Sequence, residues 1–283
     1  MNYQELCRQM AEAVDKSGKR LYDVREARAV ARVFLEDYCG FDVTDLYSGK
    51  SFVTQSGDER NDIGQAVDRL LSGEPVQYVV GKALFGDRYF SVVKGVLIPR
   101  PETEELCQWI AEEIQEGQNL LDVGTGSGCI AISIALDTHA EVTAWDIADE
   151  ALATAKKNAI NLNANVKVEK QDILQPPSDG RQWDIIVSNP PYICEKEKSG
   201  MDNNVLEHEP HLALFVPDDD PLRFYRAIAR YATSSLSMAG TLYFEINPAY
   251  RHEMELMLVS EGFTHVETRV DMFGKQRMMK AKK

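Results

Sequence analysis

The stretch WDIIVSNPPY, residues 183–192, places an amide, two prolines and an aromatic ring directly after an apolar run. The side-chain oxygen of Asn189 can accept one hydrogen bond, and the backbone carbonyl of Pro190 can accept another. Pro190 and Pro191 fix their own φ angles, so the two acceptors are held rigidly side by side. Such a pair suits the two N–H bonds of a planar NH₂ group, with Tyr192 stacked on that group or walling it off.

A planar NH₂ group is a poor nucleophile, because its lone pair is delocalised into a carbonyl or a ring. Acceptors that bind both N–H bonds aim the nitrogen at an electrophile and favour a less delocalised geometry, so orientation supplies much of the catalysis. We therefore predict group transfer to such a nitrogen, with Asn189, Pro190 and Tyr192 as catalytic residues and Pro191 completing the substrate site. The alternative is a purely structural role for these residues, as a rigid turn between a strand and a helix.

A glycine-rich loop precedes this motif in the chain. The segment LLDVGTGSGCIAIS places Gly124, Gly126 and Gly128 after an apolar strand and before a helix. Glycines let the backbone approach a ligand closely, and the G-x-G-x-G spacing differs from that of dinucleotide binders. Asp146 ends the next strand, where a carboxylate can accept both ribose hydroxyls of an adenosine ligand. Loop and acid together favour a nucleoside-type cofactor over a plain turn with a surface acid.

A third candidate is Asp172 in KQDIL, just beyond the strand expected near Val168. Its side chain, or the amide of Ile173, can meet an adenine edge. An aspartate after a strand is as often only a helix cap or turn former, so both alternatives stay open. The predicted cofactor-binding set is Gly124, Thr125, Gly126, Ser127, Gly128, Asp146, Asp172, Ile173 and Asn189.

The elements that position these residues alternate along the chain. Strands are expected at residues 120–123, 142–145, 166–168 and 185–187, and helices at 130–136 and 150–161. This alternation predicts an α/β fold with a doubly wound, mostly parallel sheet and helices on both faces. Ligands of such sheets bind at the carboxyl ends of the strands, which is where the candidate residues lie.

The region before this alternation has a different pattern. Over the first 73 residues apolar side chains recur three or four apart, and glycines provide stops, which predicts helices. Between residues 76 and 98 the period changes to two, which predicts strands at 78–80, 85–90 and 96–98 in a hairpin that turns at residues 86–87. We expect a helical domain at 1–75, a linking hairpin at 76–100 and a catalytic domain at 101–283.

Composition limits the class of protein. The 283 residues carry a formal net charge of −14, which argues against binding along a nucleic-acid backbone. No stretch approaches the roughly 18 apolar residues of a membrane span, and the N-terminus lacks a leader pattern, so we expect a cytoplasmic protein. Five cysteines without a C-x-x-C pair indicate reduced thiols rather than disulfides or a zinc site, and no metal is expected.

Four segments together resemble the release factor glutamine methyltransferase family: GVLIPRPETEEL at 95–106, the glycine-loop segment, WDIIVSNPPYI and EHEPHLALF at 207–215. The resemblance covers nearly the whole chain, including the small helical domain ahead of the catalytic one. It implies a Rossmann-like, S-adenosyl-L-methionine-dependent methyltransferase. Its substrate would be the side-chain nitrogen, N5, of the glutamine in the Gly-Gly-Gln motif of peptide chain release factors, which connects the enzyme to translation termination.

The resemblance also implies residue roles. Residues 124–128 would wrap the methionine part of the cofactor, Asp146 would hold the ribose, and Asp172 with Ile173 the adenine. Residues 189–192 would hold the substrate glutamine, with Asn189 near the transferred methyl group. Residues 1–75 are a candidate release-factor-binding unit.

Some positions depart from the family pattern. Ile173 stands where an aromatic residue is common, so only a backbone contact to adenine is implied there. The stretch FEINPAYR replaces a more usual Glu-Ile-Gly followed by Gln, and we interpret Glu245 as structural. Phe90 and Arg100 lie in a segment that closes over the site in this family.

Four other functions compete with this hypothesis. A glutamine methyltransferase of ribosomal proteins shares N-P-P-Y but is less similar over PRPETEEL. A DNA amino-methyltransferase needs a flipped base and usually a basic recognition region. A cofactor-binding scaffold without turnover has no use for two aligned acceptors, and an NAD-dependent oxidoreductase is disfavoured by the glycine spacing. We therefore expect a protein substrate, with no nucleic acid and no membrane as direct partners.

Overall fold

The structure is a computed structural model of the 283-residue chain and describes residues 1–15, 17–52 and 60–283. The helical pattern expected over the first 73 residues includes 53–59, which lie outside the described residues. The chain folds into two compact units. One contains Met1–Lys82 and Met201–His208, and the other contains Ala83–Gly200 and Glu209–Lys283.

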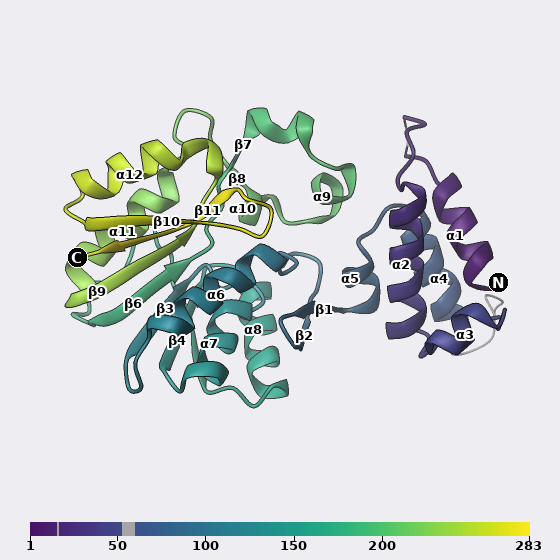
Figure 1. Cartoon of the computed structure of the whole chain (residues 1–283), viewed down its shortest axis with the longest axis horizontal. Coiled ribbons are helices and arrows are strands. Elements are labelled where there is room, and N and C mark those ends of the chain that lie inside the picture. The colour runs from purple at the N-terminus through teal and green to yellow at the C-terminus, as the bar shows by residue number, and fades with distance from the viewer. Residues whose placement is uncertain (16, 53–59) are drawn as a thin grey trace. The chain divides into compact units, whose positions relative to one another are not determined.

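The first unit, which we call the helical unit, is built from short helices (Figure 1). Asn2 caps the first helix, because its side chain accepts from the Glu5 amide while the Glu5 carboxylate accepts from the Asn2 amide. Apolar side chains such as Leu6, Phe34 and Leu70 are fully buried between the helices. The helices are α1 (Tyr3–Glu12), α2 (Val24–Asp37), α3 (Val43–Tyr47), α4 (Arg60–Leu71), α5 (Val76–Val80) and α9 (Asn203–His208).

The expectation of a strand at residues 78–80 is wrong, because these residues belong to helix α5. The Pro75 carbonyl accepts from the amides of Tyr78 and Val79, and Gly81 ends the helix at a φ of 80°. The buried residues of this turn are Val76, Tyr78 and Val79, and a run of only five residues is too short for its periodicity to distinguish a helix from a strand. The hairpin itself comprises β1 (Lys82–Phe85) and β2 (Arg88–Ser91), and the described residues 96–98 form no strand.

The second unit, the catalytic unit, is organised around a seven-stranded sheet of order β10-β11-β9-β6-β3-β4-β5. The five strands from β9 to β5 in that order run parallel. Strand β11 pairs with β9 in antiparallel fashion, and β10 pairs with β11 in the same way. The strands are β3 (Asn119–Val123), β4 (Glu141–Asp146), β5 (Val166–Lys170), β6 (Trp183–Ser188), β9 (Leu236–Glu245), β10 (Thr264–Val270) and β11 (Gln276–Lys282).

Helices cover both faces of this sheet (Figure 1). On β3, Leu121 packs into the core cluster that includes Tyr225 and Met254, whereas Leu120 packs into the cluster that includes Trp109 on the opposite face. The predicted doubly wound, mostly parallel α/β fold is therefore confirmed. One face is covered by α6 (Pro101–Glu113), α7 (Cys129–Thr138) and α8 (Asp149–Asn161), and the other by α11 (Arg223–Ser235) and α12 (Arg251–Ser260). The shorter elements are β7 (Ile193–Cys194), β8 (Phe215–Val216), α10 (His211–Leu214) and two 3₁₀ turns, Glu195–Gly200 and Pro248–Tyr250.

The strand register brings four strand ends to one edge of the sheet. Val123 at the end of β3 pairs with Trp145 on β4 and with Ser188 on β6. Ser188 pairs in turn with Phe244 on β9. The glycine loop, Asp146, Asn189 and Glu245 each come at or just after one of these positions, so the sheet gathers them at its carboxyl edge.

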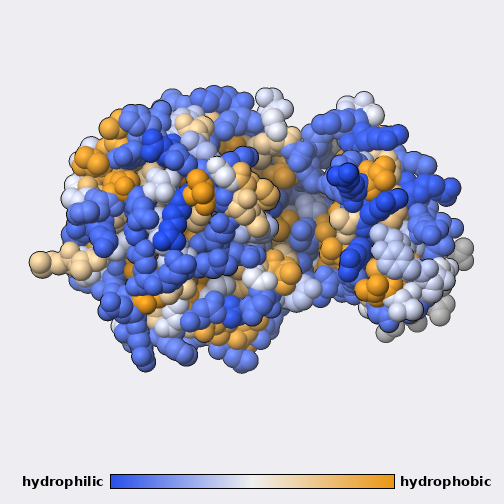
Figure 2. Space-filling model, viewed as in Figure 1, coloured by the Kyte–Doolittle hydropathy of each residue, from blue (hydrophilic) through white to orange (hydrophobic). Residues whose placement is uncertain are grey.

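The visible surface of the chain is mostly hydrophilic, with scattered hydrophobic residues (Figure 2). Within the described part of the chain, every helix is too short or too polar to cross a membrane. The five cysteines are all free thiols.

Candidate active site

A cavity of about 230 Å³ lies at the carboxyl ends of β3, β4, β5 and β6. Most of the residues predicted from the sequence line it, whereas Gly128 and Tyr192 do not. The predicted residues in its wall are Gly124, Thr125, Gly126, Ser127, Asp146, Asp172, Ile173, Asn189, Pro190 and Pro191. The structure thus brings together residues from four strand ends.

The glycine loop is held by hydrogen bonds to the neighbouring strand. The amides of Gly124 and Thr125 both donate to the Trp145 carbonyl at 2.9 Å. Gly126 has a φ of 56°, a left-handed conformation that strains residues with a side chain. Gly128 has a φ of 83°, and a Cβ there would lie 3.2 Å from the Cβ of Ala155, so both the backbone conformation and the packing favour glycine. The loop therefore exposes backbone to the cavity from a fixed position.

Asp146 ties the loop to the end of β4. Its Oδ2 accepts from the Gly126 amide at 2.9 Å, and its Oδ1 accepts from the Ala148 amide at 3.0 Å. Burial raises the pKa of Asp146. Each carboxylate oxygen has a further lone pair, and the side chain borders the cavity, so Asp146 can accept hydrogen bonds from a ligand's hydroxyl groups. This donor and acceptor pattern fits the ribose of an adenosine-type cofactor.

Sequence reasoning missed a second acid, Asp122, which lies inside β3 just before the loop. It is fully buried and accepts from Thr125 Oγ1 at 2.6 Å, while its Oδ1 has no partner among the described residues. Burial raises the pKa of Asp122 to about 7. The available signal was a carboxylate within the otherwise apolar run LLDVG, because a buried acid is unusual without a role in binding or loop positioning.

Asp172 is a turn former that also borders the cavity. Its Oδ1 accepts from the Leu174 amide at 2.9 Å, and its backbone carbonyl accepts from the Gln175 amide at 2.9 Å. Ile173 lines the cavity and packs against the core cluster under α11. This geometry is compatible with Asp172 as a turn former and also with a contact between Asp172 and the adenine of the cofactor.

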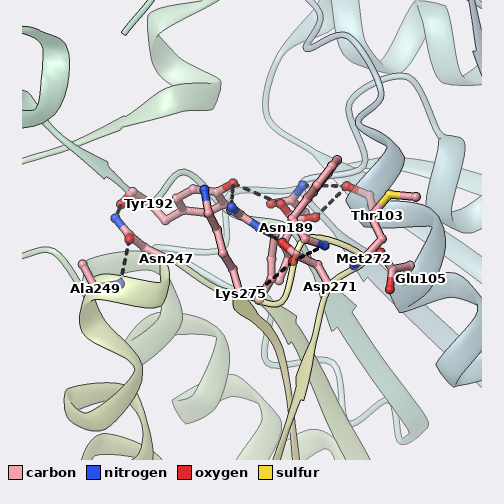
Figure 3. Close-up of polar contacts among 12 residues, drawn as sticks. Thr103, Glu105, Asn189, Tyr192, Asn247, Ala249, Asp271, Met272 and Lys275 are labelled. Atoms are coloured by element: carbon pink, nitrogen blue, oxygen red, sulfur yellow. Dashed lines mark hydrogen bonds and ion pairs between the residues drawn. The ribbon is translucent and has the colours of Figure 1, made fainter. Parts of the chain in front are cut away.

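Asn189 and Pro190 present free acceptors at the cavity. The Asn189 Nδ2 donates to Thr103 Oγ1 at 3.3 Å, and the two side chains point toward one another in Figure 3. No described residue donates to Asn189 Oδ1 or to the Pro190 carbonyl. Both residues line the cavity, which is the arrangement that a planar NH₂ group requires.

Tyr192 lies beside the cavity rather than in its wall. Its half-buried ring packs against the core cluster, and its hydroxyl donates to Glu245 Oε1 at 3.0 Å. The Arg277 Nη1 donates to the same hydroxyl at 3.4 Å. Asn247 Nδ2 donates to the Tyr192 carbonyl at 3.2 Å, a contact visible in Figure 3. Ring, hydroxyl and backbone of Tyr192 are therefore all fixed.

Glu245 connects the two ends of the N-P-P-Y motif. The carboxylate is only 1% exposed, and its Oε2 accepts from Thr103 Oγ1 at 2.6 Å. Burial raises the pKa of Glu245. An acid at a strand end was a signal similar to that of Asp146, and Thr103 lies within PRPETEEL, but neither was singled out for the site. For Arg277 the sequence carries no signal.

The two residues of the segment expected to close over the site, Arg100 and Phe90, have different surroundings. Arg100 lines the cavity, and its Nη2 pairs with Oε1 of the buried Glu209 at 2.6 Å. Oε2 of Glu209 also accepts from the Ile98 amide at 3.3 Å, so the pair fixes the chain that leads into α6. Phe90 is fully buried and meets Phe85 edge to face at 5.8 Å between ring centroids, so it is a core residue.

Comparison with known proteins places the chain in a family. Residues 102–210 match the methyltransferase small domain, and residues 12–81 match the PrmC N-terminal domain. A release factor glutamine methyltransferase of Bacteroides thetaiotaomicron is 45% identical over 95% of this chain and 97% of its own length. The chain belongs to the release factor glutamine methyltransferase family. Enzymes of the same name from Flavobacterium psychrophilum and Streptococcus pneumoniae are 47% and 41% identical, covering 75% and 78% of this chain and 76% and 80% of their own.

Solved structures agree with the fold of this methyltransferase. A methyltransferase from Pyrococcus furiosus has a TM-score of 0.52 at 17% identity, covering 68% of this chain and 87% of its own. The T. thermophilus 16S rRNA N2 G1207 methyltransferase, solved with AdoMet and guanosine, has a TM-score of 0.52 at 18% identity, covering 71% and 49%. Membership of the family makes the chain an enzyme, an S-adenosyl-L-methionine-dependent methyltransferase.

Proposed function

We propose that this enzyme transfers the methyl group of S-adenosyl-L-methionine to the side-chain amide nitrogen, N5, of the glutamine in the Gly-Gly-Gln motif of peptide chain release factors. Translation termination is the process that such methylation would modulate. The observation that carries the proposal is the pair of free acceptors, Asn189 Oδ1 and the Pro190 carbonyl, in the wall of one cavity with the glycine loop and Asp146. The names of the relatives supply the substrate class.

On the cofactor side, the cofactor supplies a methyl group carried on a positively charged sulfur. The glycine loop, residues 124–128, would hold its methionine part, with Thr125 and Ser127 in the cavity wall. Asp146 would accept from the ribose hydroxyls, and Asp172 with Ile173 would border the adenine. These roles rest on the cavity lining and on the free lone pairs of Asp146.

On the substrate side, Asn189 Oδ1 and the Pro190 carbonyl would each accept a hydrogen bond from one of the two N–H groups of the glutamine amide. Two carbonyl dipoles aimed at that nitrogen would stabilise the positive charge that develops on it during transfer, and the nitrogen would become neutral again by releasing one of its two protons. Pro190 and Pro191 keep the loop rigid, so little reorganisation is needed. Tyr192 fixes the far end of the loop through its hydroxyl contacts with Glu245 and Arg277.

The helical domain, proposed at residues 1–75, would bind the body of the release factor, with a link at 76–100 to the catalytic domain at 101–283. Apolar side chains on its surface support this role, because Val43 and Tyr47 are 56% and 70% exposed on α3. A release-factor substrate places the reaction in the cytoplasm.

A methylation assay tests the proposal directly. The full chain would be incubated with S-adenosyl-L-methionine carrying a labelled methyl group and a purified release factor, and the modified peptide mapped by mass spectrometry. We expect the label on the glutamine of Gly-Gly-Gln, and none on a release factor with that glutamine changed to alanine. Label on DNA or on a ribosomal protein, with none on the Gly-Gly-Gln peptide, would overturn the proposal.

Two substitutions separate the halves of the site. Asn189→Ala should lower kcat by about 100-fold or more, as removal of a group that stabilises transition-state charge commonly does, and leave cofactor affinity unchanged. Asp146→Ala should instead weaken cofactor binding about 10-fold or more, because hydrogen bonds to a charged group are lost. Asn161→Ala, at an exposed position on α8, is the control. Calorimetric titration of S-adenosylhomocysteine and steady-state kinetics measure the two effects, and equal effects of both variants on affinity would contradict the assignment.

A further inference from the structure

A buried carboxylate, that of Glu245, lies beneath the N-P-P-Y motif and is not part of the cavity wall. Glu245, at the end of β9, accepts from Thr103 Oγ1 at 2.6 Å through one oxygen and from the Tyr192 hydroxyl at 3.0 Å through the other. Thr103 contacts Asn189 at the start of the motif, and Tyr192 ends it. The single carboxylate is therefore linked to both ends of the four-residue motif, directly to Tyr192 and through Thr103 to Asn189.

The hydrogen bonds in this cluster have a defined direction. Asn189 Nδ2 carries only donor hydrogens, so Thr103 Oγ1 must accept from it at 3.3 Å. The one hydroxyl hydrogen of Thr103 is then directed to Glu245, which must act as an acceptor. This direction leaves Asn189 Oδ1 on the cavity side.

The opposite direction is also self-consistent, but it gives a different site. If a protonated carboxyl group or an amide at residue 245 donated a hydrogen bond to Thr103, the threonine hydroxyl would donate to Asn189. The Asn189 amide would then turn its oxygen toward Thr103 and away from the cavity. The NH₂ group of Asn189 would then face the NH₂ group of the substrate. Two donors pointed at one another leave hydrogen bonds unmade in a buried site, which is costly.

We propose that Glu245 is a positioning residue whose carboxylate, acting through Thr103, sets the orientation of the Asn189 amide and, through Tyr192, holds the other end of the motif. The inference rests on the proposed function, because only a substrate with N–H bonds needs the Asn189 oxygen in the cavity. It assigns Glu245 a role beyond the structural one that we inferred from the sequence.

The surroundings of Glu245 support its role as an acceptor. Burial raises its pKa, but the two hydroxyl donors and the Arg277 guanidinium favour the ionised form. The Tyr192 hydroxyl accepts from Arg277 Nη1 at 3.4 Å, so its own hydrogen is available for Glu245. The Glu245 backbone carbonyl accepts from the Tyr225 hydroxyl at 3.0 Å, which anchors the end of the strand. Every contact of this carboxylate is thus compatible with an anion.

The decisive comparison is between Thr103→Val and Thr103→Ser in the full chain. Valine has nearly the shape of threonine but removes the hydroxyl, whereas serine keeps it. We expect Thr103→Val to lower kcat about 10-fold, the effect of one net hydrogen bond, with KM for the cofactor within about twofold. Thr103→Ser should retain kcat within about threefold. Thr233→Val, which removes a hydroxyl that donates to the Arg230 carbonyl within α11, is the matched control and should leave kcat unchanged.

Glu245→Gln tests the carboxylate itself. It keeps the size of the side chain but introduces a donor, so it should lower kcat at least as much as Thr103→Val. Because the residues act through one chain of hydrogen bonds, the double variant should be no slower than the more impaired single variant by more than about threefold. Additive losses would mean that the two residues act independently, which would overturn the relay. If Glu245→Gln unfolds, the Thr103 pair still decides the question.

A measurement without turnover completes the test. In nitrogen-edited NMR spectra, the Asn189 side-chain amide resonances should move in Thr103→Val and in Glu245→Gln, and stay in place in Thr103→Ser and Thr233→Val. If the wild-type enzyme methylates the release factor and Thr103→Val is as fast as Thr103→Ser, the positioning role fails and the proposed function stands. If the wild type does not methylate a release factor, the proposed function fails, and unchanged Asn189 resonances in Thr103→Val would separately refute the positioning role.

Discussion

The two units of this enzyme bury different kinds of side chain. In the helical unit, the described buried side chains are hydrophobic, such as Leu6, Phe34 and Leu70. The catalytic unit buries polar and ionisable groups as well, among them Asp122, Glu209 and Glu245. Burying an ionisable group is costly unless it is hydrogen-bonded, and these groups lie under the loops that form the cavity. The difference indicates that buried side chains in the helical unit mainly stabilise its fold, whereas buried polar groups in the catalytic unit also position the loops around the cavity.

Core truncation in the helical unit should have the largest effect. Phe34 is fully buried on α2, so Phe34→Ala should lower the free energy of unfolding of that unit by about 3–5 kcal/mol through lost burial and a residual cavity. Cofactor affinity should remain unchanged, because every residue that lines the cavity belongs to the catalytic unit. Urea unfolding followed by circular dichroism and titration of S-adenosylhomocysteine measure the two quantities.

The neighbouring Val33, which is 37% exposed, provides the control for this experiment. Val33→Ala should change the free energy of unfolding far less than Phe34→Ala. A fall in cofactor affinity parallel to the loss of helix in Phe34→Ala would break the comparison, because it would mean that the cavity depends on the core of the helical unit.

The buried acid in the catalytic unit should make stability depend on pH. The pKa of Asp122 is raised from 3.8 to about 7 by burial, so the folded chain holds a proton that the unfolded chain releases. The stabilising effect of that proton is complete below pH 3.8 and is lost as the pH rises through about 7. Over that range the free energy of unfolding should fall by a few kcal/mol, about 1.4 kcal/mol for each unit of pKa shift.

Substitution of Asp122 isolates this contribution. Asp122→Asn removes the titrating group, so the fall in stability between pH 5 and pH 8 should become shallower than in the wild type. Asp149→Asn, which changes an acid whose side chain is 77% exposed, should leave the slope as it was. Denaturation midpoints at several pH values provide the measurement, and an unchanged slope in Asp122→Asn would show that the carboxyl is ionised in the folded chain.

Local patterns in the sequence predicted the fold and part of the site, but not the contacts between residues far apart in the chain. Strand and helix periodicity predicted the sheet, and the rule that ligands bind at strand ends identified the glycine loop, Asp146 and Asn189 as neighbours. The contact between Thr103 and Glu245 joins residues 142 positions apart. Such a contact depends on which strand β9 lies beside and on its register, and no local pattern encodes either.

Local ambiguity accounts for the wrong strand at residues 78–80. Helix α5 has only five residues, three of them valine, so propensity favours a strand, and the Pro75 and Gly81 boundaries decided otherwise. Tyr192 was predicted to stack on the planar NH₂ group of the substrate or to wall it off. The structure turns its hydroxyl to Glu245 and Arg277, and neither partner is near it in the sequence.

The smallest expected effect concerns the surface of the helical unit. Val43 is 56% exposed at the start of α3, so Val43→Ser should change the free energy of unfolding by no more than about 0.5 kcal/mol. If this unit grips the release factor, the loss of an apolar contact should raise KM for the intact release factor by about 3- to 10-fold. KM for a short Gly-Gly-Gln peptide should stay the same, because the peptide is too small to reach beyond the cavity. Ile160→Ser, at a 76% exposed position on α8 in the catalytic unit, is the matched control. Equal KM values of Val43→Ser and wild type for the intact substrate would remove Val43 from the contact surface, whereas a parallel rise for peptide and protein would place the effect in the catalytic unit instead.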